Sequence, residues 1–269
     1  MRLWVADGEK GLICVQEGKK ISVGLPAEAL CAGGDCVYCA GRGRCACYDP
    51  LRGAPRFETA AAPGVCVLCA QGETLYALSC EADSVTAFSA RTGEIICCAP
   101  AGAYPRDLKI SPGGKVLAAA GGASGEIHLL DRDLCPLRIF RVPGTVCGVC
   151  FQPRGLWALC AVEDGDLSAR LYAVSRRGVT EEVFSSPLTP SCLCPLPGGG
   201  CALGLHGEIR CLKANQKTAL RRRCSCPVRI RAGDQGIWVC DAGEERVFHT
   251  GGKTLYRGPA PMDALLFPD

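Results

Sequence analysis

Several features are scarce or missing in this 269-residue sequence, and each absence excludes a class of protein. No apolar run approaches the length of about eighteen residues that a membrane span needs. The opening stretch, MRLWVADGEKGLICV, lacks the apolar core and the small-residue cleavage site of an export signal. We therefore expect a cytoplasmic protein with no membrane partner.

Histidine is also scarce, and its three copies show no His-x-x-x-His spacing and accompany no serine or cysteine nucleophile motif. Because His128, His206 and His249 lie far apart in the chain, the sequence assigns no catalytic residue. Charged residues make up 21 % and the net charge is +3. This balance argues against a disordered chain and against a surface built throughout for nucleic acid.

Cysteine, in contrast, is abundant, with 22 residues. Because the chain lacks an export signal and is 48 % hydrophobic, we expect reduced thiols and not a disulfide framework. Pairs with metal-knuckle or redox spacing are Cys36/Cys39, Cys66/Cys69 and Cys147/Cys150, and pairs one residue apart are Cys45/Cys47, Cys192/Cys194 and Cys224/Cys226. In a strand, residues three apart point to opposite faces, so we expect these thiols to fill the core. We predict no metal site and no cofactor.

A repeat runs along the chain, and each unit opens with a proline. The opening residues are Pro26, Pro63, Pro105, Pro143, Pro190, Pro227 and Pro261, with gaps of 37, 42, 38, 47, 37 and 34 residues. In the clearest copies, residues 63–99 and 105–142, short apolar runs alternate with glycine-containing turns and show no helical period. Each unit therefore reads as four short strands.

The repeat closes on itself, because the gap from Pro261 around to Pro26 is again 34 residues. The ending PMDALLFPD matches the first strand of a unit, and residues 2–6 match the second. The sequence thus predicts an all-β, seven-bladed β-propeller of four-stranded blades, a single domain over residues 1–269. In one blade the C-terminal strand pairs with the three N-terminal strands, which removes the exposed strand edges.

The second strands of the units begin with similar chemistry. They start at Leu3, Val37, Leu75, Val116, Leu156 and Ile237, with a weaker copy at Cys201. Most copies place an aromatic residue next, as in LWVA and VYCA. We expect these rings to pack between adjacent blades.

Two segments carry a recognisable repeat pattern. One is Ser84-Val85-Thr86-Ala87-Phe88 with Thr92-Gly93, and the other is Ile110-Ser111-Pro112-Gly113-Gly114. Over residues 63–153 this pattern resembles the YVTN-type, WD-like repeat of lactonase-like propellers, while the other blades keep only the spacing. The resemblance implies the fold and says little about function.

Carboxylates recur two residues after three of the repeat prolines, at Glu28, Asp107 and Asp263. Equivalent repeat positions lie at one height, near the mouth of the central channel. Converging oxygens there would hold a hard cation or orient a water for hydrolysis. The alternative is that each carboxylate accepts hydrogen bonds from amides of the neighbouring blade.

A basic segment lies between Ile209 and Gly233, with eight positive residues and no acidic one. Because the whole chain has a net charge of +3, the rest of the chain has a net charge of −5. Besides Arg229 and Arg231, its members are Arg210, Lys213, Lys217, Arg221, Arg222 and Arg223. We expect a positive patch on the rim of the sixth blade, able to meet phosphate, nucleic acid or an acidic partner. The segment has no aromatic residue for base stacking, and a charged edge strand that prevents aggregation explains it equally well.

The leading functional hypothesis is a binding or scaffold module that recognises another protein or a small anionic ligand, with nucleic acid as a lesser possibility. The resemblance implies an alternative, a lactone hydrolase or lyase of the 6-phosphogluconolactonase type. Such an enzyme would draw channel-mouth residues together, namely Glu28, Arg106, Asp107, Arg229 and Asp263. A third class, a thiol-based metal or redox protein, would need two same-face cysteine pairs on adjacent strands.

Overall fold

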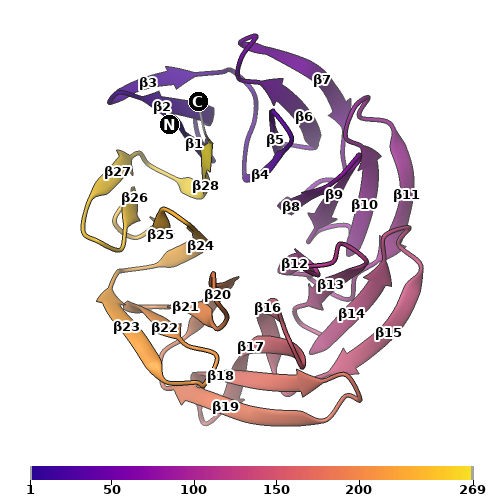
Figure 1. The fold of residues 1–269 in the computed structure, drawn as a ribbon, viewed down its shortest axis with the longest axis vertical. Coiled ribbons are helices and arrows are strands. Elements are labelled where there is room, and N and C mark those ends of the chain that lie inside the picture. Colours follow the sequence, from indigo (N-terminus) through magenta and orange to yellow (C-terminus); the bar gives the residue numbers. More distant parts are fainter. Residues whose placement is uncertain (1, 268–269) are drawn as a thin grey trace.

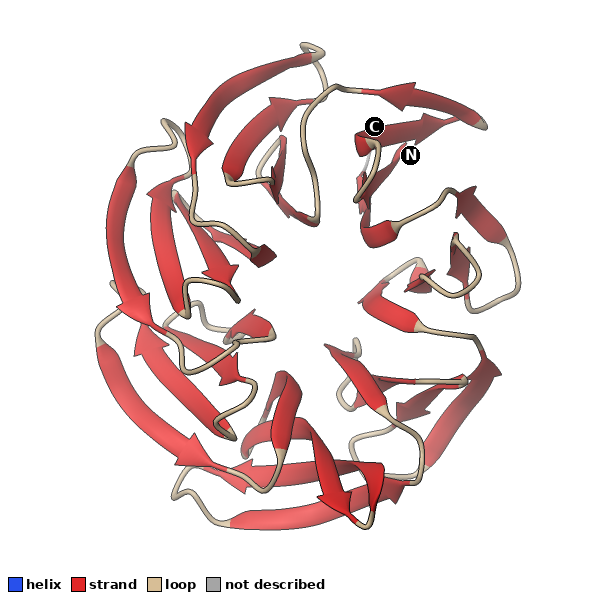
Figure 2. Ribbon diagram, turned by 180° about the vertical axis from the view of Figure 1, so that it is seen from behind, coloured by secondary structure: helices blue, strands red, loops and turns tan. Residues whose placement is uncertain are grey.

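Seven four-stranded antiparallel sheets stand around a central axis in the computed structural model, which describes residues 2–267 (Figure 1). Every regular element in this range is a β-strand (Figure 2). The described residues accordingly include no helix able to cross a membrane. The predicted all-β propeller of seven blades is confirmed.

The strands occupy equivalent positions in every blade, and we call them first to fourth from the axis outward. The first strands are β4 (Ala29–Gly33), β8 (Val65–Gln71), β12 (Asp107–Ile110), β16 (Thr145–Gln152), β20 (Pro190–Pro195), β24 (Pro227–Gly233) and β28 (Pro261–Phe267). The second strands are β1 (Arg2–Asp7), β5 (Cys36–Gly41), β9 (Thr74–Ser79), β13 (Val116–Gly121), β17 (Gly155–Asp164), β21 (Cys201–Leu205) and β25 (Gly236–Asp241). The third strands are β2 (Gly11–Gln16), β6 (Arg44–Asp49), β10 (Ser84–Ser89), β14 (Glu126–Asp131), β18 (Asp166–Ser175), β22 (Glu208–Leu212) and β26 (Arg246–His249). The fourth strands are β3 (Lys19–Ser22), β7 (Ala54–Ala60), β11 (Ile95–Pro100), β15 (Pro136–Arg141), β19 (Thr180–Ser186), β23 (Thr218–Arg223) and β27 (Thr254–Arg257).

The ring closes through a sheet with the strand order β28-β1-β2-β3. Strand β1 pairs antiparallel with β28, in the register Leu3↔Leu266, Trp4↔Leu265 and Val5↔Ala264. The predicted pairing of the C-terminal strand with the three N-terminal strands is therefore confirmed. Figure 1 shows β28 beside β1 in this blade.

The repeat prolines lie at or just before the start of the first strands. Pro190, Pro227 and Pro261 are the first residues of β20, β24 and β28. A proline has no N–H to donate, so the start of a strand is one of the few positions in a sheet that accept it. The proline spacing therefore marks where each blade begins.

The core lies between neighbouring blades, and aromatic side chains link one blade to the next. Tyr38 on β5 packs against residues of the following blade, and its hydroxyl donates a hydrogen bond to the Ala90 carbonyl at 3.0 Å. Trp238 on β25 likewise donates to the Ala264 carbonyl on β28 at 3.2 Å. Such rings bury large apolar surfaces while their polar ends remain satisfied, which ties adjacent blades together.

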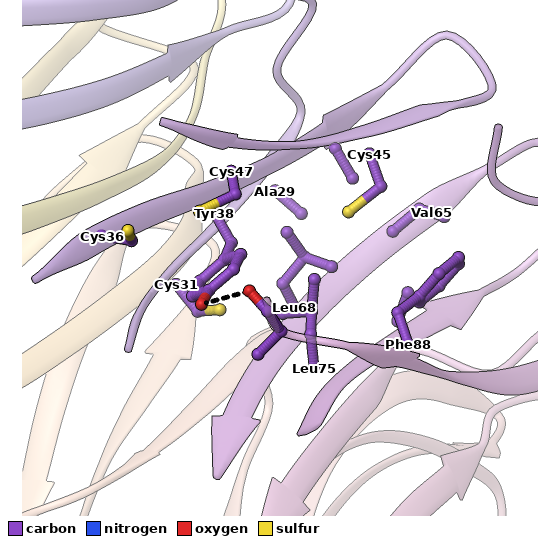
Figure 3. Packing of buried hydrophobic residues seen from close by; sticks show 13 residues of the cluster. Ala29, Cys31, Cys36, Tyr38, Cys45, Cys47, Val65, Leu68, Leu75 and Phe88 are labelled. Atoms are coloured by element: carbon purple, nitrogen blue, oxygen red, sulfur yellow. Dashed lines mark hydrogen bonds between the residues drawn. The ribbon is translucent and has the colours of Figure 1, made fainter. Parts of the chain in front are cut away.

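The cysteines mostly act as small apolar side chains within this core. All 22 are free, with fourteen buried and only Cys98 and Cys135 exposed. Cys36 and Cys39 point into different inter-blade clusters, as expected for strand residues three apart. In Figure 3, Cys36 and other thiols lie among alanine, leucine, valine and phenylalanine side chains. Burial raises the pKa of the Cys45 thiol to about 12, so it stays protonated and unreactive.

Candidate functional site

The first strands surround the central channel, and alternation along two of them aims charged side chains at it. Asp107 and Lys109 share one face of β12, and Arg229 and Arg231 share one face of β24, because residues two apart in a strand point the same way. Asp263 on β28 completes the group. Three cations and two carboxylates therefore lie on the strands that surround the channel.

Asp263 joins three blades through its carboxylate and is only 1 % exposed. Arg231 donates to it from Nε at 3.1 Å and from Nη2 at 2.6 Å, and the Leu30 amide of β4 donates to Oδ2 at 3.1 Å. Burial raises the pKa of Asp263, but the charges of Arg231 and Arg229 outweigh that effect and hold it below its usual range. Both oxygens are thus held by donors of the protein itself.

Asp107 plays the same structural part on the other side of the ring. Its Oδ2 accepts from the Val149 amide of β16 at 3.1 Å, its Oδ1 accepts from the Leu108 amide at 3.0 Å, and Lys109 forms an ion pair with it. The side chain is 4 % exposed. Asp107 and Asp263 therefore each bridge adjacent first strands, as the hydrogen-bonding alternative described.

Arg229 reaches across the channel. Its Nη2 donates to the Cys66 carbonyl on β8 at 2.7 Å, although β24 and β8 belong to blades separated by two others. Its Nε lies 4.0 Å from Asp263 Oδ2, beyond hydrogen-bond distance, and is a buried nitrogen without a hydrogen-bond partner among residues 2–267. The guanidinium of Arg229 is thus only partly satisfied.

The remaining channel-mouth candidates lie elsewhere. Glu28 precedes β4 and is half-buried beside a hollow of about 320 Å³, lined also by Lys10 and Arg42. Arg106, the residue before β12, is exposed. The structure therefore brings Asp107, Arg229 and Asp263 to the channel but does not bring Glu28 or Arg106 into contact with them. Lys109 and Arg231 join the group instead, and the two-residue alternation in the sequence could have indicated both.

The basic segment is divided among different environments. Glu208, the residue just before the segment, is 4 % exposed and forms ion pairs with Arg210 and Arg221. Arg229 and Arg231 point into the channel and not to the rim. The segment's remaining exposed cations are Lys213, Lys217, Arg222 and Arg223.

The histidines and cysteines remain dispersed. His128 on β14 contacts Glu126 at 3.0 Å, while His249 lies in the blade of β24–β27, where its Nε2 is 3.0 Å from the Gln235 carbonyl. A bulge between Val65 and Val67 turns both Cys66 and Cys69 toward one cluster, but no group of three or more potential metal ligands occurs in residues 2–267.

A large apolar groove lies on one face of the ring. Because antiparallel strands alternate in direction, the turns from first to second strands and from third to fourth strands all lie on this face. Over the blades of β12–β15, β16–β19 and β20–β23 it is hollowed by a groove of about 700 Å³. Its apolar lining includes Leu129, Phe140, Phe151, Leu156, Val174 and Leu196.

The polar residues of the groove are cationic or neutral. Arg138 and Arg176 line it, together with Ser111, Gln152 and Ser175, and no acidic side chain among residues 2–267 does. Arg138 stacks over the Phe140 ring at 4.9 Å and donates to the Arg176 carbonyl at 2.9 Å, which joins two blades at the groove edge. An adjoining hollow of about 470 Å³ adds Arg154 and one acid, Glu181.

The shape of the chain is similar to that of many solved propellers, although no family model and no curated protein matches its sequence. A 6-phosphogluconolactonase-like protein from Bacteroides fragilis has a TM-score of 0.71 and 13 % identity, covering 98 % of this chain and 97 % of that one. The WD40 propeller domain of Doa1 has a TM-score of 0.72 and 13 % identity, covering 90 % of this chain and 86 % of that one. A chain of the Mitotic Checkpoint Complex has a TM-score of 0.72 and 12 % identity, covering 87 % and 79 %.

These likenesses confirm the resemblance to lactonase-like and WD40-like propellers at the level of the fold. At such identities the likeness shows the fold alone, because unrelated functions occur on one propeller framework. The specific YVTN-type repeat stays a prediction.

Proposed function

We propose that this propeller is a cytoplasmic protein-binding scaffold whose partner docks in the apolar groove over β12–β23. The observation that carries the proposal is the groove itself, about 700 Å³ in volume, with an apolar lining and a cationic edge. Concave apolar sites with a few placed polar groups are the usual form of a recognition site. A reducing compartment suits a chain with 22 free cysteines.

The charges at the groove select the chemistry of the partner. Arg138 and Arg176 line the groove, and Arg154 lies beside it. Among the described lining residues of the groove and the adjoining hollow, Glu181 is the one acid. A docked segment therefore places apolar side chains in the groove and carboxylates next to the arginines, since complementary charge fixes the register of a complex. The occupant we infer is a short apolar segment of another protein, flanked by aspartate or glutamate.

The similar structures lend this proposal some support, because one of them is a chain of a protein assembly, the Mitotic Checkpoint Complex. The lactone-hydrolase alternative has less support from the structure. A hydrolase needs a carboxylate or other base free to activate water. Asp107 and Asp263 are each occupied by backbone amides and a basic side chain, so the channel arrangement favours a structural role for both.

The test is a selection of binders from a random peptide library displayed on phage, followed by affinity measurements with purified protein. We expect the selected peptides to combine apolar residues with flanking acids. The double variant Arg154→Glu/Arg176→Glu changes two exposed positions at the groove and should weaken their binding about tenfold or more, because like charges then meet.

The matched control is Arg222→Glu/Arg223→Glu, which reverses two exposed charges on β23, outside the groove lining. Its affinity should equal that of the unmodified protein. Selected peptides without acids, or equal losses in both double variants, would overturn the proposed groove.

A further inference from the structure

The central channel carries an excess of positive charge that its own carboxylates do not balance. Lys109, Arg229 and Arg231 face Asp107 and Asp263, which leaves one surplus cation in this group. In a channel lined by protein, an uncompensated charge is costly, because the surroundings solvate it less well than water does.

Solvent reaches the cations much more than the carboxylates. The side chains of Arg229, Lys109 and Arg231 are 17 %, 23 % and 29 % exposed, whereas Asp263 and Asp107 are 1 % and 4 % exposed. The carboxylate oxygens accept hydrogen bonds from backbone amides of β4 and β16 and are almost inaccessible to solvent. A dissolved ion entering the channel therefore meets positive groups first.

Arg229 donates fewer hydrogen bonds to protein acceptors than Arg231 does. Arg231 donates two hydrogen bonds to the Asp263 carboxylate, whereas Arg229 donates a hydrogen bond of 2.7 Å to the neutral Cys66 carbonyl and lies 4.0 Å from Asp263. Its buried Nε lacks a hydrogen-bond partner in the described part of the chain. Buried N–H groups are nearly always satisfied, so an orphaned one points to a missing acceptor.

The three cations also act on a common point, although they come from separate blades. Burial raises the pKa of the Cys69 thiol on β8, and the charges of Lys109, Arg231 and Arg229 each offset part of that rise. All three charges therefore lie close enough to β8 to act on one of its side chains.

We propose that the channel binds a small oxyanion, a carboxylate or phosphate group, at Arg229 with Lys109 as the second cation. Guanidinium groups present a planar set of donors that matches such oxygens. The bound anion balances the surplus charge and accepts from Arg229. This site is separate from the groove and does not depend on the proposed protein partner.

The experiment measures thermal unfolding of the full chain in increasing inorganic phosphate, with ionic strength held constant by sodium chloride. We expect a saturable rise in melting temperature, about 5 °C when phosphate is in roughly hundredfold excess over its dissociation constant. Sodium acetate in a parallel series distinguishes carboxylate from phosphate recognition.

The variants separate a site from the general stabilising effect of phosphate on proteins. Arg229→Met should lose the saturable rise and Lys109→Met should weaken it. Arg222→Met, an exposed arginine on β23, should keep it. An equal rise in Arg229→Met and Arg222→Met, or the lack of any saturable rise, would overturn the proposal.

If Arg229→Met fails to fold, as judged by circular dichroism, the unmodified protein still decides the question. A crystal grown with selenate locates the anion by anomalous scattering. Selenate within hydrogen-bond distance of Arg229 supports the site, and a channel free of selenate while the anion binds elsewhere refutes it.

Discussion

Removal of the Asp263 carboxylate tests whether the buried charges of the channel hold the closing strand in place. In Asp263→Ala, Arg231 loses its carboxylate partner and keeps the Leu30 carbonyl as an acceptor, and the Leu30 amide loses its own acceptor. The Arg231 side chain is 29 % exposed in the unmodified protein. Breaking a buried ion pair from one side typically costs about 3–5 kcal/mol, because the other charge stays uncompensated. The partial exposure of Arg231 places our expectation at the lower end, about 3 kcal/mol.

Urea unfolding followed by circular dichroism gives the free energy of unfolding for Asp263→Ala, Arg231→Met and the double variant. The double variant should lose less unfolding free energy than the sum of the losses in the two single variants. The difference, the coupling energy, should be about 1–3 kcal/mol, since the pair interacts directly. The control is Asp133→Ala, whose side chain is 74 % exposed and which should change stability by about 0.5 kcal/mol or less. A cost near that of the control, or strictly additive losses, would refute the reasoning.

Four further predictions follow from the same structure. Because the pKa of Asp263 is lowered in the folded state, the unfolded chain binds more protons in acid. The free energy of unfolding should therefore decrease as the pH drops below about 4, and this decrease should be smaller in Asp263→Asn, as acid titrations of both proteins would show. Deleting residues 261–269 removes β28 and leaves β1 with an open edge, so cooperative unfolding in calorimetry should disappear. Tyr38→Phe should cost about 1 kcal/mol through one lost hydrogen bond and Tyr38→Ala about 3–5 kcal/mol through the cavity, and equal losses in urea unfolding would contradict this account. A bulky thiol reagent should modify Cys98 and Cys135 in the native state well before the buried thiols, and mass spectrometry of the labelled peptides would reveal any other order.

The architecture could be predicted from the sequence because its signals are local and repeated. Proline suits the start of a first strand, where no N–H is needed, so the spacing from Pro26 to Pro261 counts the blades. The ending PMDALLFPD matched a first strand without partners of its own, which predicted the closure with β1. Both signals depend on backbone geometry alone.

The arrangement of the channel was harder to predict, because repeat equivalence fixes the height of a residue but not what its side chain contacts. Asp107 and Asp263 turn to amides of the next blade, whereas Glu28 does not enter the channel group. Glu208 directly precedes the basic segment and pairs with Arg210 in space, so the charges within the segment do not reveal this partner. The apolar groove combines turns from three blades and has no contiguous signature in the sequence.

The closed ring has a consequence for how the molecule comes apart. A linear array of repeats frays from its ends, because a terminal unit loses only one neighbour when it unfolds. Here each blade has two neighbours, so the departure of any blade breaks two interfaces. The one joint without a covalent link is the ladder between β1 and β28. Thermal opening should therefore start at this single seam and convert the circle into an array with two free ends.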